Sequence, residues 1–222
     1  MGLNRPYQRT DELPGTIPVF PLTGALLLPR GQMPLNIFES RYVQMVEDSL
    51  RSHRLVGMVQ PDEGARGLQG APGIHTVGCA GRITQFAETG DGRILITLTG
   101  VCRFRIFEEL NAATPYRICA VDFDSFAADL DASLGEEEVD RQSVVRMLRA
   151  FAENNRIKLD WNEIERAPNE ALVNALAMMS PFGAVEKQAL LEAETLKARA
   201  EVLVALAEIE FARGGNSSSA LQ

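Results

Sequence analysis

The segment that decides the fold is residues 34–42, PLNIFESRY, in which an apolar run leads into a helix. Residues suited to a protein core then recur at the spacing of one helical face: Tyr42, Met45, Val46, Ser49 and Leu50. This period predicts an amphipathic helix. Glu39 stands at its start, where a carboxylate interacts favourably with the helix dipole. Phe38 precedes the helix, and we expect it to pack against the helix as a hydrophobic staple.

Strand signals lie on both sides of this helix. Residues 17–22 (IPVFPL) carry a short strand signal, although their prolines favour an edge or bulged strand. Residues 25–28 form a second short apolar run, and residues 55–60 are typical of a strand. Residues 61–73 (PDEGARGLQGAPG) are rich in Gly and Pro and predict a long loop, either mobile or functional.

The clearest β signal is a hairpin in the middle of the chain. Residues 79–87 and 93–99 flank residues 89–92 (TGDG), where Asp-Gly supplies the positive φ angles of a tight turn. A third strand over residues 101–107 and a fourth over residues 116–123 alternate core-facing and more polar positions. These segments predict a meander of at least four strands that is closed or strongly curled.

The second half of the chain has helical patterns. The expected helices cover residues 136–151, 169–179, 184–191 and 196–212. Asn169 and Thr195 are expected N-caps, since their side chains can accept bonds from helix N–H groups. The last helix is apolar on nearly every side, at Val202, Leu203, Val204, Leu206 and Ile209. Such a helix either packs inside a bundle or presents one face to another protein.

These patterns divide the chain into segments of different character. We expect a flexible N-terminus over 1–14, a β domain over 15–125, a linker over 126–135, a helical bundle over 136–213 and a disordered Gly/Ser-rich tail over 214–222. Strands followed by helices indicate an α+β fold.

The composition of the 222 residues is that of a globular protein, with 45% hydrophobic and 23% charged residues. No apolar run is long enough to span a bilayer, and the N-terminus carries no signal-peptide pattern. We therefore expect a cytoplasmic protein that makes no membrane contact. The formal net charge of −8 argues against a nucleic-acid partner, because binding phosphates requires a basic face.

Motifs for catalysis and cofactor binding are missing from the sequence. No lysine belongs to a phosphate-binding G-x-x-x-x-G-K-[ST] loop, and no G-x-S-x-G motif presents a nucleophilic serine. A dyad of Ser180 and Lys187 stays open, although we expect Lys187 to be solvated and protonated. Several helical carboxylates are typical of a solvated face: Glu136, Glu137, Glu138, Glu163 and Glu165. We expect no catalytic residue and no cofactor.

The cysteines and histidines do not form a metal-binding pattern. Cys79, Cys102 and Cys119 are odd in number and lack any C-x-x-C spacing. His53 and His75 stand alone. We expect no metal and no disulfide, with the cysteines as small buried side chains of strands in a reducing compartment.

Residues 34–42 resemble the PLxIFExRY signature of the N-terminal domain of Lon proteases. Further segments resemble that family in the same order along the chain: 17–22, 28–29, 78–83, 91–93, 100–106 (GVCRFRI), 180–182 (SPF) and 186–192 (EKQALLE). The resemblance covers about residues 15–213. It implies a PUA-like curled β domain with one inserted helix, followed by a helical bundle, in a bacterial, proteolysis-related protein that binds polypeptides.

Full-length Lon proteases continue into an AAA+ ATPase module and a Ser/Lys peptidase domain, and this sequence contains neither. The resemblance therefore implies a stand-alone, non-catalytic binder of unfolded or specific polypeptides that acts as an adaptor or a chaperone-like protein. The residues that we expect to contact the partner are Arg30, Phe38, Arg41, Tyr42 and Leu68.

Two alternatives of other classes stay open. PUA-like folds also bind RNA, which would need a basic groove; the candidates on the predicted strands are Arg82, Arg93, Arg103 and Arg105. LON-like domains also serve as protein–protein scaffolds in ubiquitin-ligase receptors, and the sequence does not separate this role from polypeptide binding. A weak homo-oligomer is compatible with each of these readings.

Overall fold

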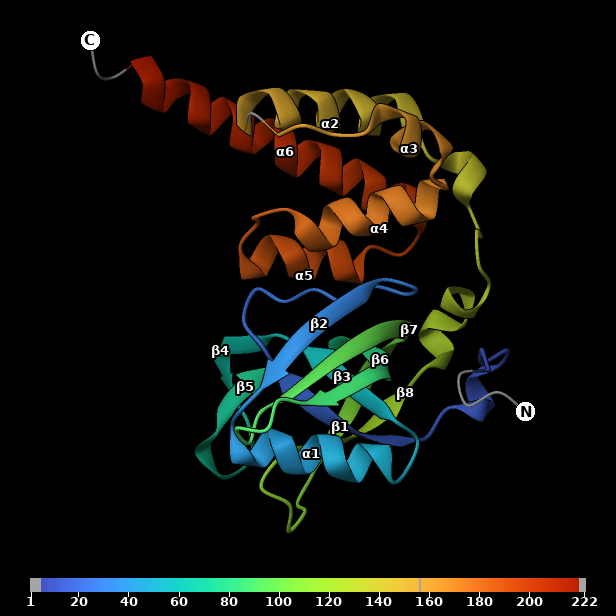
Figure 1. Ribbon diagram of the computed structural model, residues 1–222, viewed down its shortest axis with the longest axis vertical. Helices are drawn as coiled ribbons and strands as arrows, with labels where there is room; N and C mark the ends of the chain where they lie inside the picture. Colours follow the sequence, from blue (N-terminus) through green and yellow to red (C-terminus); the bar gives the residue numbers. More distant parts are fainter. Residues whose placement is uncertain (1–4, 156, 220–222) are drawn as a thin grey trace. The chain divides into compact units, whose positions relative to one another are not determined.

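The computed structural model describes residues 5–155 and 157–219. The chain divides into two compact units, Met1–Ala132 and Ser133–Gln222. In the described part of the chain, the first unit contains the main sheet and the second is built from helices. The predicted α+β class is confirmed, with strands in the first unit and helices dominating the second (Figure 1).

The sheet of the first unit closes on itself. Its strands are β1 Thr16–Pro21, β2 Gln32–Ile37, β3 Leu55–Val59, β6 Val77–Glu88, β7 Ile94–Leu110 and β8 Arg117–Asp122. The order is β2-β7-β6-β3-β1-β8, and β7 also pairs with β8. The long strand β7 thereby joins both ends of the sheet into a curled barrel, as the sequence predicts. β7 runs without a break through Gly100, where we predicted two separate strands.

The barrel interior depends on close approach between one large ring and two glycines. Phe104 of β7 is fully buried. A Cβ atom on Gly78 would lie 2.5 Å from the Phe104 ring, and one on Gly57 would lie 2.8 Å from it. These contacts are shorter than any side chain tolerates, so both strands need glycine where the ring passes.

Helix α1 (Ser40–Leu50) connects β2 to β3 and confirms the predicted amphipathic pattern. Its buried residues are Tyr42, Met45, Val46 and Ser49. The apolar run before it is not a plain lead-in to the helix, because residues 32–37 pair with β7 as strand β2.

Residues 61–74 form a small hairpin instead of the predicted long loop. Strand β4 (Pro61–Arg66) pairs with β5 (Pro72–Ile74), with a short 3-10 turn at Leu68–Gly70 between them. Arg117 of β8 donates a 2.9 Å hydrogen bond to the carbonyl of Pro72 and forms a 2.6 Å ion pair with Glu109. β4 has no buried residue, so the sequence shows no alternation that would reveal it.

The hairpin between β6 and β7 is present, but its turn differs from the prediction. The positive φ angles belong to Gly90 (80°) and Gly92 (83°) and not to an Asp-Gly pair. The Asp91 carboxylate instead accepts a 3.2 Å hydrogen bond from the N–H of Arg93, which closes the loop.

The predicted linker over 126–135 largely belongs to the first unit. Residues Asp124–Leu130 form a 3-10 helix, η3, that packs on β7. Phe126 and Asp129 are buried there, and Asp129 forms a buried ion pair with Arg103 at 2.8 Å. We predicted flexibility over 1–14. Residues 1–4 lie outside the described part, but residues Thr10–Glu12 form a 3-10 turn and Leu13 is buried.

The second unit is a helical bundle arranged around its last helix. Its described helices are η4 Glu136–Glu138, α2 Arg141–Asn155, α3 Trp161–Arg166, α4 Asn169–Met179, α5 Ala184–Glu192 and α6 Leu196–Ser219. α6 contacts α2, α4 and α5, which explains why it is apolar on nearly every side.

The ends of these helices agree only in part with the prediction. Thr195 accepts a 3.1 Å hydrogen bond from the N–H of Ala198, as expected of an N-cap. Asn169 is the first residue of α4 and not its cap; its side-chain amide donates to the carbonyl of Glu136 at 2.8 Å. α6 continues to Ser219, whereas we expected a disordered tail from residue 214; residues 220–222 lie outside the described part.

Candidate polypeptide-binding site

A hollow of about 420 Å³ lies beside α1, and we call it the α1 hollow. It is lined by Phe38, Ser40, Val43, Gln44, Glu47, Asp48, Arg51 and Gly92. All but Gly92 belong to α1, to the two residues before it or to Arg51, which directly follows it. The amphipathic helix therefore buries one face in the barrel and presents another to this hollow.

Phe38 supplies the apolar side of the α1 hollow. The preceding residue, Ile37, is the last of β2 and is buried. Successive side chains along an extended backbone point to opposite faces, so Phe38 points outward. Its side chain is 66% exposed, and it does not pack on α1 as the predicted staple.

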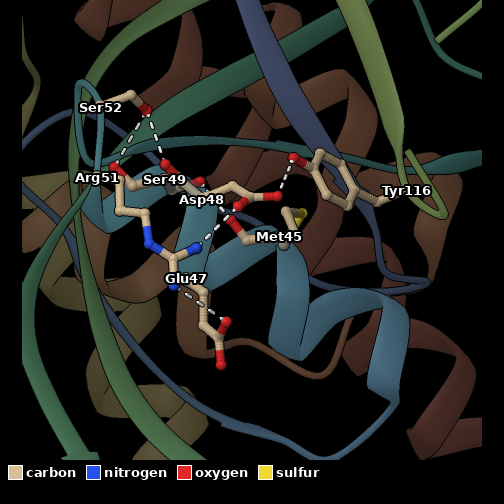
Figure 2. Close-up of polar contacts among 7 residues, drawn as sticks. All are labelled: Met45, Glu47, Asp48, Ser49, Arg51, Ser52 and Tyr116. Atoms are coloured by element: carbon tan, nitrogen blue, oxygen red, sulfur yellow. Dashed lines mark hydrogen bonds and ion pairs between the residues drawn. The ribbon is translucent and has the colours of Figure 1, made fainter. Parts of the chain in front are cut away.

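The C-terminal half of α1 supplies a polar rim (Figure 2). The Asp48 carboxylate accepts hydrogen bonds from Arg51 at 3.1 Å and from the hydroxyl of Tyr116 at 2.9 Å. Arg51 also forms a 3.5 Å ion pair with Glu47. Burial, which is the larger cause, and the hydrogen bond to Asp48 raise the pKa of Tyr116 to about 12. Its hydroxyl therefore remains a donor at neutral pH.

The hydrogen bonds and the ion pair of this rim hold the charged side chains of Glu47, Asp48 and Arg51 in place beside the hollow. Two carboxylates share one guanidinium, so the rim keeps a net negative charge beside an exposed aromatic ring. Of the lining residues, only Phe38 was predicted as a partner contact; the others are Ser40, Val43, Gln44, Glu47, Asp48, Arg51 and Gly92. The signal that could have found them is the face of the predicted helix opposite its apolar stripe, immediately after Phe38.

Two neighbours of Phe38 are placed differently from the prediction. Tyr42 is buried, with its ring centroid 4.3 Å from that of Phe20, and burial raises its pKa. Arg41 pairs with Glu39 at 2.8 Å and lies 4.5 Å over the Tyr42 ring. Tyr42 therefore packs the core and is not available as a contact, and neither Tyr42 nor Arg41 lines the α1 hollow.

The remaining candidates lie elsewhere in the first unit. Leu68 is half exposed at the tip of the β4–β5 hairpin. Arg30 adopts a left-handed backbone conformation, with φ 64°, and donates a 2.6 Å hydrogen bond to the carbonyl of Asp129. It lines a second hollow, of about 300 Å³. The candidate partner-binding residues thus do not form one continuous surface.

The arginines considered for RNA binding do not form an exposed basic groove. Arg82 and Arg103 are buried, and Arg103 is neutralised by Asp129. Arg93 pairs with Asp91 at 3.3 Å, and Arg105 is exposed. No observation on these residues adds support to phosphate binding.

The lysine of the possible Ser180–Lys187 dyad lies on α5. Lys187 is half-buried, whereas we predicted a fully solvated side chain. Burial lowers its pKa. Its ammonium group lies 3.4 Å from the carbonyl of Met178. Within 5–155 and 157–219 no group of His, Cys, Asp and Glu could hold a metal ion. None of the described helices is long and apolar enough to cross a bilayer.

The three cysteines give a direct test of the barrel. Cys79, Cys102 and Cys119 are free and buried, as predicted. Burial raises the pKa of Cys119 to about 11 and raises that of Cys102 as well. Because the thiolate is the reactive form, we expect no thiol to react with an aromatic disulfide reagent at about pH 8 in the folded chain. All three should react in denaturant; rapid labelling of the folded chain would contradict this packing.

Comparison with solved structures first places the fold among N-terminal domains of Lon proteases. The N-terminal domain of a Mycobacterium avium complex Lon protease matches with a TM-score of 0.64 at 16% identity, covering 87% of this chain and 98% of that one. A Lon N-terminal domain protein from Xanthomonas campestris matches with a TM-score of 0.58 at 23% identity, covering 86% and 97%. At these identities the likeness concerns the fold.

The sequence then gives the family. Residues 16–208 match the model of the ATP-dependent protease La (LON) substrate-binding domain, and the chain belongs to this family. "Lon protease 2" of Myxococcus xanthus is 25% identical over 205 residues, covering 88% of this chain and 24% of the relative. A Lon protease of Desulfosudis oleivorans is 31% identical over 97 residues, covering 43% and 12%. The chain spans about a quarter or less of the length of these relatives, and the part matched is the non-catalytic substrate-binding domain.

Proposed function

We propose that this chain is a non-catalytic module that binds unfolded or specific polypeptides, in the manner of an adaptor or a chaperone-like protein. Membership of a substrate-binding domain family supports a recognition role. The observation that carries the proposal is the 66% exposed ring of Phe38 at the edge of the α1 hollow. Three free, buried cysteines fit a reducing compartment, and we place the module in the cytoplasm.

The chemistry of the α1 hollow suits an extended chain with an apolar side chain followed by polar or basic groups. Its volume of about 420 Å³ lies within the roughly 300–1,000 Å³ usual for binding sites. Covering the Phe38 ring removes apolar surface from water, and full burial of such a side chain is worth about 1.5–3 kcal/mol. The carboxylates of Glu47 and Asp48 would favour a cationic group at the other end.

The proposal predicts that Phe38→Ala weakens binding of an unfolded protein. With reduced, carboxymethylated lactalbumin as the probe, we expect a loss of roughly tenfold or more, because a central aromatic contact contributes about 2 kcal/mol. Equilibrium titration by fluorescence anisotropy measures the change, and thermal melting checks that the variant folds.

Phe107→Ala is the matched control. Phe107 is 71% exposed on β7 and does not line the α1 hollow. The Phe107→Ala substitution removes the same kind of ring from another site, so we expect this variant to bind the unfolded protein with the affinity of the parent chain. Equal losses in the two variants would show that binding is not localised at α1, and no binding by the parent chain would overturn the proposed function.

A further inference from the structure

The second hollow of the β unit lies between the N-terminal segment, the turn at Arg30 and strands β6 and β7. Its volume is about 300 Å³. It is lined by Pro6, Tyr7, Arg30, Arg82, Thr84, Thr99, Gly100, Val101, Leu130 and Ala132. We call it the arginine hollow, since two arginines line it and no acidic side chain is among the described residues that line it.

Arg82 is the unusual group in the arginine hollow. Its side chain lies on β6, opposite Thr99 of β7, and the residue is only 9% exposed. It donates a 2.7 Å hydrogen bond to the carbonyl of Arg5, and its guanidinium lies 4.4 Å from the centroid of the Tyr7 ring. Neither contact brings a negative charge, although a buried cation without a counter-ion is costly.

A neighbouring arginine shows how this barrel neutralises a buried guanidinium when no ligand is involved. Arg103 of β7 is also buried, and the Asp129 carboxylate accepts two hydrogen bonds of 2.8 and 2.9 Å from its side chain. Arg82 receives no such carboxylate from the described residues. Its remaining N–H donors are therefore suited to an anion that comes from outside the chain.

The other walls of the hollow restrict the kind of anion. Pro6, Val101, Leu130 and Ala132 are apolar. The hydroxyls of Thr84 and Thr99 lie 2.9 Å apart and add a small polar floor. A guanidinium presents a planar fork that matches the two oxygens of a carboxylate, and the apolar walls suit a hydrocarbon group attached to it. A phosphate dianion would find few donors beyond the guanidinium groups and would leave the apolar walls unused.

We propose that the arginine hollow binds the free C-terminal carboxylate of a polypeptide whose last residue is apolar. Arg82 binds the carboxylate, and the terminal side chain lies against Val101 and Leu130. The inference rests on the proposed function, because it names the part of the polypeptide that is recognised. It assigns this task to a hollow whose lining residues are all different from those of the α1 hollow.

The test compares two forms of one peptide on the full chain. The probe is an N-terminally fluorescein-labelled hexapeptide of glycine and serine that ends in leucine, with either a free carboxylate or a terminal amide. We expect the acid to bind at least about tenfold more tightly than the amide, because a hydrogen bond to a charged group is lost in the amide. Equal affinities of acid and amide would overturn the inference without requiring any variant to fold.

Variants then locate the site. Arg82→Gln should remove the preference for the acid, and Arg82→Lys should restore only part of it, because an ammonium group lacks the bidentate fork. Arg105→Gln removes the same charge from an exposed position of β7 and should leave the preference intact. A preference that persists in Arg82→Gln, or that disappears equally in Arg105→Gln, would exclude Arg82 as the carboxylate ligand.

Two further arms separate this inference from the proposed function. N-acetyl-leucine should compete weakly with the peptide acid. If N-acetyl-leucine binds and the peptide acid does not, the hollow is a site for small carboxylic acids and not for the C-termini of polypeptides. Phe38→Ala should leave the acid-over-amide ratio unchanged. If carboxymethylated lactalbumin binds through Phe38 while acid and amide peptides bind alike, only the carboxylate inference fails.

Discussion

Asp129→Ala is expected to destabilise the β unit by about 3–5 kcal/mol, the cost of leaving a buried charge without its partner. The carboxylate of Asp129 accepts hydrogen bonds from the backbone N–H, the Nε–H and the Nη2–H of Arg103, at 2.8 to 2.9 Å. The Arg103 guanidinium also lies 4.6 Å from the centroid of the Phe126 ring. Removing the carboxylate leaves the cation under η3 and weakens the attachment of η3 to β7.

Thermal and urea unfolding followed by circular dichroism measure this effect. Asp131→Ala is the control, since Asp131 is exposed at the end of the same segment and its loss should change stability by less than about 0.5 kcal/mol. The double variant Arg103→Met/Asp129→Leu should recover much of the loss, because apolar side chains of similar size can replace a buried ion pair. Unchanged stability in Asp129→Ala would mean that η3 does not cover Arg103 in solution.

The contrast between α1 and η3 shows what the sequence could predict. The pattern of α1 is local: four of its five predicted core residues are buried, and the helix begins within a residue of the expected place. Asp129 carries no such local signal. It stands in a polar, irregular stretch that predicts a linker, and its partner lies 26 residues earlier on a strand. Long-range pairing of this kind appears only when the barrel closes.

The candidate site shows the same division. The sequence offers Phe38 as a candidate contact, because it precedes a helix within a segment that resembles a known signature, and the structure leaves its ring exposed. Tyr42, four residues later, was predicted with it but packs on Phe20, since the helical period places it in the core stripe. Arg82 was considered only for RNA binding. Its separation from the carboxylates of the described residues depends on how β6, β7 and the N-terminal segment meet, which no local pattern encodes.

Gly100→Ala is expected to cost more than about 3 kcal/mol, since it forces backbone apart and cannot be relieved by a rotamer change. A Cβ atom at residue 100 would lie 2.0 Å from the carbonyl oxygen of Leu28. Gly100 accepts a hydrogen bond from the N–H of Arg30 and donates one to the carbonyl of Gly31, each 2.8 Å long. These two bonds hold residues 26–28 against β7, where all three leucines are buried.

Displacing this segment would cost both backbone bonds and part of the leucine burial, and it would also move Arg30 and Gly100 in the wall of the arginine hollow.

Gly15→Ala is the matched control, because a Cβ atom there meets nothing within 4 Å and its φ is not positive. That variant should be as stable as the parent or more stable by up to about 1 kcal/mol, through a less flexible unfolded chain. Urea midpoints that agree for the two alanine variants would show that Leu28 does not approach β7 this closely. A large loss of stability in Gly100→Ala, with none in Gly15→Ala, would show that the close approach of Leu28 requires glycine at the start of residues 100–106.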